Sequence, residues 1–173
     1  NELTTIIVSP LNDQFTFDEN KYLLTKSDQK SQHFDVLKFA RKDIIEANIK
    51  SSIKFIDSHA FKNCHNLQTV TFSEGSQLQV IGKEAFYNCE NLNEIFIPST
   101  VTKIGTSAFS ECNSLQKIEI PKNSNLQIIE KFAFTDCNIN EIYIPSTVTT
   151  ILDYAIDCYN LSKIEIEENS QLQ

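Results

Sequence analysis

The stretch IGKEAFYNCENLNEIFIPSTVTKI, residues 81–104, decides the fold. Its apolar positions follow a fixed order: Ile, then Ala-Phe, then Cys, then Leu, then Ile-x-Ile. The same order recurs in copies led by Ile56, Ile81, Ile104 and Ile129, and a fifth, imperfect copy is led by Ile151. The lead isoleucines are 25, 23, 25 and 22 residues apart, and self-similarity at such a period indicates a solenoid of stacked coils.

Each apolar position has a physical role in such a stack. One coil cannot bury its apolar residues alone, so it shares a core with its neighbours. The Ile-x-Ile stretch alternates as a strand with one buried face does, and stacked strands pair in parallel about 4.7–4.9 Å apart. The following Pro ends the strand because it has no N–H to donate. The Ala-Phe-x2-Cys segment predicts a short helical turn.

The period also identifies the fold class, because leucine-rich repeats are roughly 20–29 residues long. We therefore predict an α/β repeat solenoid of the leucine-rich-repeat kind. It would be a right-handed coil with a parallel β-sheet and short helical turns, preceded by a β-rich N-terminal cap.

The residues before the repeats do not fit this frame. Residues Phe15–Leu24 read as strand, Asp/Asn turn and strand, which predicts a hairpin. Asp35–Phe39 predicts another strand, and a helix over Phe34–Glu46 is the alternative. The regular pattern begins near Ala47.

We therefore divide the chain into residues 1–46, a cap or atypical hairpin-bearing segment, and residues 47–173, a solenoid of about five coils. At the other end, Ser170–Gln173 repeats Ser76–Gln79, after which a new coil opens. Natural solenoids end in a polar cap, so we expect this solenoid to be truncated at its C-terminus and to belong to a longer array.

The repeats resemble the BspA-like, or Treponema pallidum-type, leucine-rich repeats. That family's pattern is similar to Ile-Gly-x2-Ala-Phe-x2-Cys-x2-Leu-x2-Ile-x-Ile-Pro, which residues 81–98 reproduce. The Asn- and Lys-rich variety with a leading hairpin resembles copies expanded in parasitic protists such as trichomonads. Ile156 replaces the Phe in the last repeat, and the fourth repeat is one residue short after Cys137. The resemblance implies a surface or secreted protein that binds host or neighbouring-cell macromolecules.

One cysteine occupies the same position in every coil. These residues are Cys64, Cys89, Cys112, Cys137 and Cys158. We interpret them as a structural ladder of buried free thiols that act as small hydrophobes and weak donors. One or two disulfides remain an alternative, because stacked Cα atoms lie within bridging range, and so does reactive or metal-bound sulfur. No close Cys pair of the kind that binds zinc is present, so we expect no metal site.

No residues combine into a catalytic constellation. Cys64 and His65 are adjacent but lack a third, orienting group, and His59 occupies a variable position that reads as solvent. The chain has no phosphate-binding or dinucleotide-binding glycine motif, so we expect no enzyme activity and no cofactor. Asn160-Leu161-Ser162 is a lone glycosylation sequon before a predicted strand.

The middle residue of each Ile-x-Ile points away from the core, which predicts an exposed face on the parallel sheet. Two columns result, and we predict them as the binding face: Thr71, Phe96, Glu119, Tyr143 and Glu165, flanked by Thr69, Glu94, Lys117, Glu141 and Lys163. Exposed aromatic side chains among charges are typical of protein-binding surfaces, where aromatic anchors dominate affinity. Sheets also favour Thr and aromatic residues for packing reasons alone, which is the competing interpretation.

The composition limits the classes of partner that the chain is expected to bind. The formal charge is −8, so we expect no nucleic-acid binding, and no apolar run is long enough to insert into a membrane. We predict a non-enzymatic protein-binding module at the cell surface or secreted. Its partner would be a protein, extracellular-matrix or host-surface macromolecule, and self-association is possible in such a module. An intracellular, cytoplasmic protein–protein interaction scaffold is the alternative.

Overall fold

Short strands recur twice in each coil of the computed structural model, which describes residues 6–9 and 11–172. Residues 1–5, residue 10 and Gln173 belong to the two predicted segments but lie outside the described residues. The strands are β1 Phe15–Asp18, β2 Tyr22–Thr25, β3 Val36–Ala40, β4 Glu46–Ile49, β5 Phe55–Ile56, β6 Thr69–Phe72, β7 Val80–Ile81, β8 Glu94–Phe96, β9 Lys103–Ile104, β10 Lys117–Glu119, β11 Ile128–Ile129, β12 Glu141–Ile144, β13 Thr150–Ile151 and β14 Lys163–Ile166.

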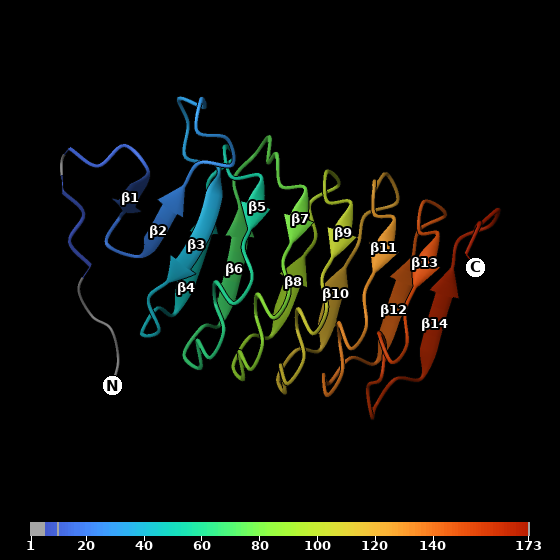
Figure 1. The fold of residues 1–173 in the computed structure, drawn as a ribbon. Helices are drawn as coiled ribbons and strands as arrows, with labels where there is room; N and C mark the ends of the chain where they lie inside the picture. The colour runs from blue at the N-terminus through green and yellow to red at the C-terminus, as the bar shows by residue number, and fades with distance from the viewer. Residues whose placement is uncertain (1–5, 10, 173) are drawn as a thin grey trace.

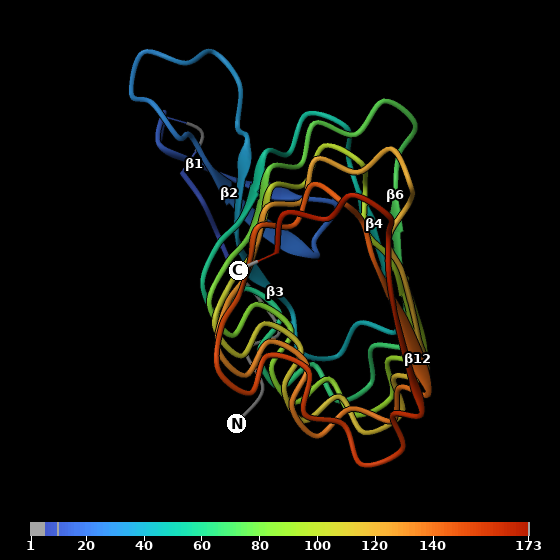
Figure 2. The same cartoon turned by 90° about the vertical axis from the view of Figure 1, so that its right-hand side faces the viewer.

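The strands form two walls that face each other across the core (Figures 1 and 2). One wall, the long sheet, has eight strands in the order β1-β2-β3-β5-β7-β9-β11-β13. The other wall, the second sheet, consists of three two-stranded units, β4-β6, β8-β10 and β12-β14. All strand pairs that join one coil to the next are parallel, as stacking equivalent strands in register requires.

The core between the walls contains one ladder of phenylalanine rings. Phe61, Phe86, Phe109 and Phe134 are fully buried and stack with centroids 4.7, 5.1 and 5.5 Å apart. The lead isoleucines and the leucines of the repeats are buried around them, as the sequence pattern predicts, except in the last repeat, where Ile151 and Leu161 are half-buried. Burying such side chains contributes about 1.5–3 kcal/mol each, which is why a coil is stable only beside its neighbours.

The Ala-Phe segments depart from the prediction. No helix is present among residues 6–9 and 11–172, so the predicted helical turns are not found and the fold is an all-β solenoid. The residue before each Ala has a positive φ, such as 64° at His59, and so has the second residue after each Phe, such as 60° at Asn63. The N–H of Phe61 donates to the carbonyl of Ala85 in the next coil at 2.7 Å. A residue that bonds across coils cannot also form the i to i−4 bond of a helix.

The N-terminal hairpin forms as predicted. β1 and β2 pair antiparallel, and Glu19 and Asn20 between them have φ of 50° and 53°, as a tight hairpin turn requires. β3 covers most of the predicted strand and excludes the alternative helix over Phe34–Glu46. It pairs antiparallel with β2 and parallel with β5.

Parallel pairing therefore begins upstream of Ala47, within the segment expected to be a cap or atypical coil. β3 and β4 together supply both strands of a first, atypical coil, and β4 pairs in parallel with β6. The division at Ala47 remains our proposal for where the regular repeats begin.

Candidate interaction surface

The outward residues of the second sheet form the surface that the sequence indicated. Nine of the ten predicted residues are exposed, and Tyr143 is half-buried. They are Thr69 and Thr71 on β6, Glu94 and Phe96 on β8, Lys117 and Glu119 on β10, Glu141 and Tyr143 on β12, and Lys163 and Glu165 on β14. The ring of Phe96 is 45% exposed, which is high for a phenylalanine and makes it available as an anchor.

Strand register places these residues in rows. Lys117 lies opposite Glu94, and Glu119 lies opposite Phe96. In the next unit Glu141 lies opposite Lys163, and Tyr143 opposite Glu165. The middle Ile of the triplets on β8, β10 and β12 is buried, so the charged and aromatic side chains on either side of it share the outer face.

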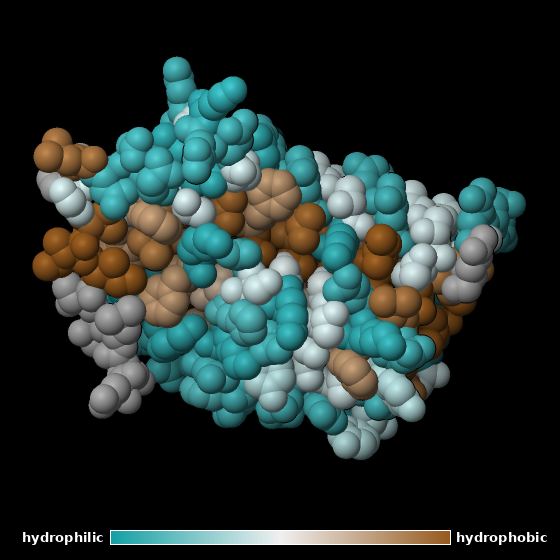
Figure 3. All heavy atoms as spheres, viewed as in Figure 1, coloured by the Kyte–Doolittle hydropathy of each residue, from teal (hydrophilic) through white to brown (hydrophobic). Residues whose placement is uncertain are grey.

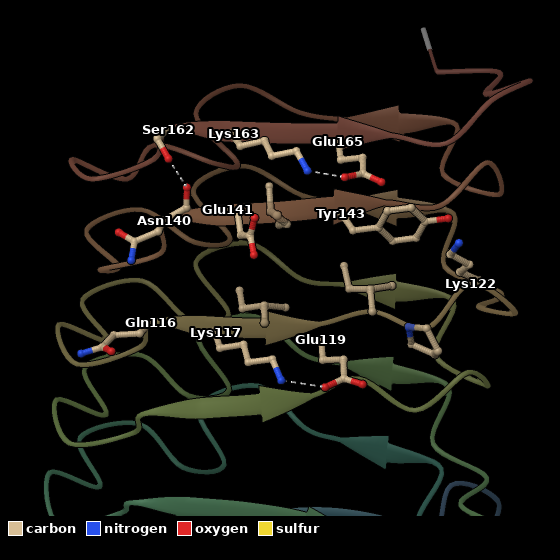
Figure 4. Close-up of a pocket in the computed structure, with 14 residues that line it drawn as sticks. Gln116, Lys117, Glu119, Lys122, Asn140, Glu141, Tyr143, Ser162, Lys163 and Glu165 are labelled. Carbon is tan, nitrogen blue, oxygen red and sulfur yellow. Dashed lines mark hydrogen bonds and ion pairs between the residues drawn. The ribbon is translucent and has the colours of Figure 1, made fainter.

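The lysines of this surface bond within their own strands. Lys117 Nζ lies 3.1 Å from Glu119, and Lys163 Nζ lies 2.5 Å from Glu165 (Figure 4). Within the described residues, Glu94 and Glu141 form no ion pair. Solvent screens exposed pairs of this kind, so they add little stability and rearrange readily when a partner binds.

Two shallow depressions follow the gaps between the two-stranded units. One, of about 410 Å³, lies over β6 and β8 and is lined by Glu94 and Phe96. The other, of about 620 Å³, lies over β10, β12 and β14 and is lined by Glu141 and Tyr143 (Figure 4). No backbone pairing joins β6 to β8 or β10 to β12 among the described strands. Residue spacing accounts for neither gap, since β12 pairs in register with β14 despite the shortened connection after Cys137.

Tyr143 has a distinctive environment. Its hydroxyl is shielded from solvent and forms no hydrogen bond with the described residues. Burial raises the pKa of Tyr143, and the nearby carboxylates of Glu167 and Glu165 raise it further. Glu167 instead accepts a hydrogen bond from the backbone N–H of Ser146 at 2.7 Å, which helps to lower its pKa.

The cysteines of the ladder link neighbouring coils through hydrogen bonds to the backbone. The thiol of Cys89 donates to the carbonyl of Phe61 in the preceding coil at 3.3 Å. The same bond recurs from the next three cysteines: Cys112 to Phe86, Cys137 to Phe109 and Cys158 to Phe134. All five cysteines are free, and Cys158 alone among them is not fully buried. Burial raises the pKa of Cys64 to about 12, which suppresses its reactivity.

The histidines are not brought together with a nucleophile. His59 and His65 are exposed and lie 3.5 and 3.3 Å from Glu84 and Glu90, while His33 lies in the loop between β2 and β3. No group of His, Cys, Asp and Glu that could hold a metal occurs in the described part of the chain. No described helix could cross a membrane.

The sequence analysis did not single out the outer face of the long sheet. Phe55, Val80 and Ile128 lie in one half-buried row there, interrupted by Lys103. Figure 3 views this side, and hydrophobic atoms run across it in a broken band from the hairpin end, where Ile7 and Leu11 are 89% and 95% exposed. The first residue of each two-residue strand carries this row, and runs this short give too weak an alternation to be recognised in the sequence.

Solved structures resemble this chain over much of its length. The pneumococcal vaccine antigen PcpA is 33% identical, with a TM-score of 0.68, over 73% of this chain and 31% of that one. A leucine-rich cell surface protein of Faecalibacterium prausnitzii is 22% identical, with a TM-score of 0.57, over 91% and 53% of the two chains. The T. pallidum leucine-rich repeat protein is 22% identical, with a TM-score of 0.71, over 91% and 70%. The chain thus spans about a third and about half of the first two proteins.

A comparison with curated proteins finds no match. The family described as BspA type leucine rich repeat region matches residues 35–156 in six copies, and those residues include the ladder of phenylalanine rings, four of the five cysteines and most of the second sheet. By this match and by its fold, the chain belongs to the BspA-type leucine-rich repeat family.

Proposed function

We propose that the chain is a non-enzymatic binding module that contacts a macromolecular partner through the outer face of the second sheet. The observation that carries this proposal is an exposed Phe96 and a half-buried Tyr143, two coils apart, among the charged side chains of β8, β10, β12 and β14. Aromatic side chains in such a setting supply most of the affinity of protein interfaces, and surrounding charges select the partner.

We place this module at the cell surface or in a secreted protein, in adhesion or contact with a host cell or matrix. Two similar structures support this placement: one is described as a vaccine antigen and the other as a cell surface protein. An intracellular scaffold is the second candidate, and the five unpaired thiols favour it because thiols stay reduced in the cytosol. Surface biotinylation of intact cells distinguishes the two, since labelling before lysis requires external exposure.

An unbiased peptide-display selection on the folded chain tests the binding face. Selected peptides should bind the wild type and lose affinity for the chain with Phe96→Ala and Tyr143→Ala. The matched control is Tyr154→Ala with Tyr159→Ala, which removes two exposed aromatic side chains outside this face. Equal affinity of the selected peptides for the Phe96/Tyr143 variant and the wild type would show that the face is wrong.

A further inference from the structure

Cys137 and Cys158, which precede β12 and β14, lie side by side in neighbouring coils. The backbone N–H of Asp136 donates to the carbonyl of Asp157 at 3.1 Å, so the cysteines that follow these two residues are in register. The thiol of Cys158 lies 3.1 Å from the carbonyl oxygen of Phe134, in the coil that carries Cys137. Backbones joined in this way lie about 4.8 Å apart, within the range of roughly 4.4–6.8 Å between Cα atoms that a disulfide bridges.

Solvent reaches this pair more readily than the rest of the cysteine ladder. Cys158 is half-buried, whereas Cys89 and Cys112 are fully buried. Cys137 is 3% exposed and lines a surface depression of about 300 Å³, beside the exposed Tyr159. Hydrogen peroxide is little larger than water, which occupies about 30 Å³, so it can enter this depression.

The contact between the two sulfurs prepares Cys158 for oxidation. The Cys137 thiol can donate a hydrogen bond to the Cys158 thiolate, and this lowers the pKa of Cys158 although burial opposes the change. The same hydrogen bond, and then burial, raise the pKa of Cys137, so the proton stays on the buried sulfur. Thiolates rather than thiols react with peroxides, and redox-sensitive cysteines typically lie beside a second cysteine that completes a disulfide.

We propose that Cys158 is an oxidation site and that Cys137 converts its sulfenic acid into a disulfide. The Cys158 thiolate attacks hydrogen peroxide, so that an S–O bond forms and the O–O bond breaks. The hydroxide that leaves takes up a proton from solvent and becomes water. The sulfur of Cys137 then attacks the sulfur of Cys158, so that the S–S bond forms and the S–O bond breaks. The hydroxyl group leaves with the Cys137 proton as a second water. Two thiols are thereby oxidised and one peroxide is reduced to two waters.

This disulfide fastens a weakly packed coil to its neighbour. On β14, Ile164 and Ile166 are 50% and 49% exposed, whereas the equivalent Ile142 and Ile144 of β12 are buried. Segments with few buried apolar contacts open locally at a low cost in free energy. A covalent link before β14 restricts the open state, so oxidation slows the opening of this coil.

The test treats the whole reduced chain with hydrogen peroxide and then blocks the remaining thiols with N-ethylmaleimide. We expect three blocked thiols in place of five, because two of the five cysteines pair. Proteolysis after Glu141, which lies between the two cysteines, should give one pair of peptides joined through Cys137 and Cys158. Mass spectrometry detects this pair, and dithiothreitol should separate it. Amide hydrogen exchange on β14 should slow by about tenfold or more in the cross-linked chain.

Three variants test the role of each sulfur. Cys137→Ala should leave the oxidised Cys158 as a sulfenic acid, which dimedone traps. Cys158→Ala should keep its four remaining thiols free. Cys112→Ala is the matched control, because it removes an equally buried thiol of the ladder and carries the same risk to folding, yet it should still form the disulfide.

A disulfide between any other two cysteines, within one chain or between two, would overturn the proposal. A wild-type chain that keeps five free thiols, or that accumulates dimedone adducts at Cys158 without a disulfide, would overturn it as well. Unchanged hydrogen exchange on β14 after cross-linking would show that the disulfide does not fasten the coil. None of these results bears on binding by the second sheet, which the Phe96 and Tyr143 variants test separately.

Discussion

Tyr22 of the hairpin lies edge-on against Phe61, with the ring centroids 6.1 Å apart and the planes at 62°. It is buried, and its hydroxyl accepts a hydrogen bond from the backbone N–H of Asn48 at 3.2 Å. In the first, atypical coil Arg41 follows Ala40 where the later coils have Phe, so the ladder of phenylalanine rings lacks a member there. Tyr22 covers that end of the ladder, and the hairpin therefore acts as the N-terminal cap of the core.

Removing this ring should destabilise the whole stack. We expect Tyr22→Ala to cost about 3–5 kcal/mol of unfolding free energy, as for other buried aromatic side chains. Tyr22→Phe keeps the ring but leaves the N–H of Asn48 without its acceptor, and should cost about 1 kcal/mol. Urea denaturation of the three proteins measures both values, and equal losses for the two variants would contradict the capping role of the ring.

Gly82 and Gly105 stack closely in neighbouring coils. A Cβ on Gly105 would lie 2.7 Å from the carbonyl carbon of Gly82 and 2.8 Å from the N of Lys83, and this backbone cannot give way. Gly105→Ala should therefore destabilise the chain by about 1–3 kcal/mol. Gly75→Ala is the control, since a Cβ there meets no atom within 4 Å and only its φ of 71° opposes the change. A larger loss for Gly75→Ala in thermal unfolding would contradict the packing.

Native alkylation should distinguish the five cysteines. Cys158 is half-buried, and its pKa is lowered because the Cys137 thiol can donate to a Cys158 thiolate. Hydrogen bonding with the neighbouring cysteine, and then burial, raise the pKa of Cys89 and Cys137, which keeps them as thiols. Iodoacetamide followed by mass spectrometry should give one rapid adduct, at Cys158. Rapid labelling of Cys89 in the folded protein would contradict a buried ladder.

Low pH should weaken the contacts by which Asp35 holds the loop before β3. This buried carboxylate accepts hydrogen bonds of 2.7 Å from both the N–H and the hydroxyl of Ser27, and Lys54 lies 3.5 Å away. Burial alone would raise the pKa of Asp35, but these contacts outweigh it and lower the pKa below 3.8. A carboxylate whose pKa is lowered in the folded state stabilises the fold fully at a pH above its unfolded-state pKa. This stability is lost as the pH falls through the folded-state pKa.

The stability difference between the wild type and Asp35→Asn should therefore be full at neutral pH and shrink below about pH 4. Urea denaturation at pH 7 and at pH 3 measures this difference. A constant difference across that range would show that the charge of Asp35 contributes nothing.

The sequence was sufficient to predict the order of the coils and the two exposed columns, because alternation about a buried Ile determines which residues face outward. The sequence was insufficient to predict the backbone conformation of the Ala-Phe segments. A positive φ at His59 or Phe132 has no signature in the residue type, and the bonds that favour it come from the next coil. Asn63 and Asn88 were the available signal, because Asn adopts this conformation more readily than other residues. The gaps between the units of the second sheet have no signature in the residue spacing.

The binding surface that we propose is the outer face of the second sheet. Amide chemical-shift changes, measured by NMR during titration with a display-selected peptide, test it most directly. We expect the changes to gather on β8, β10 and β12, with the largest near Phe96 and Tyr143. Changes gathered instead on Phe55, Val80 and Ile128 of the long sheet would contradict it.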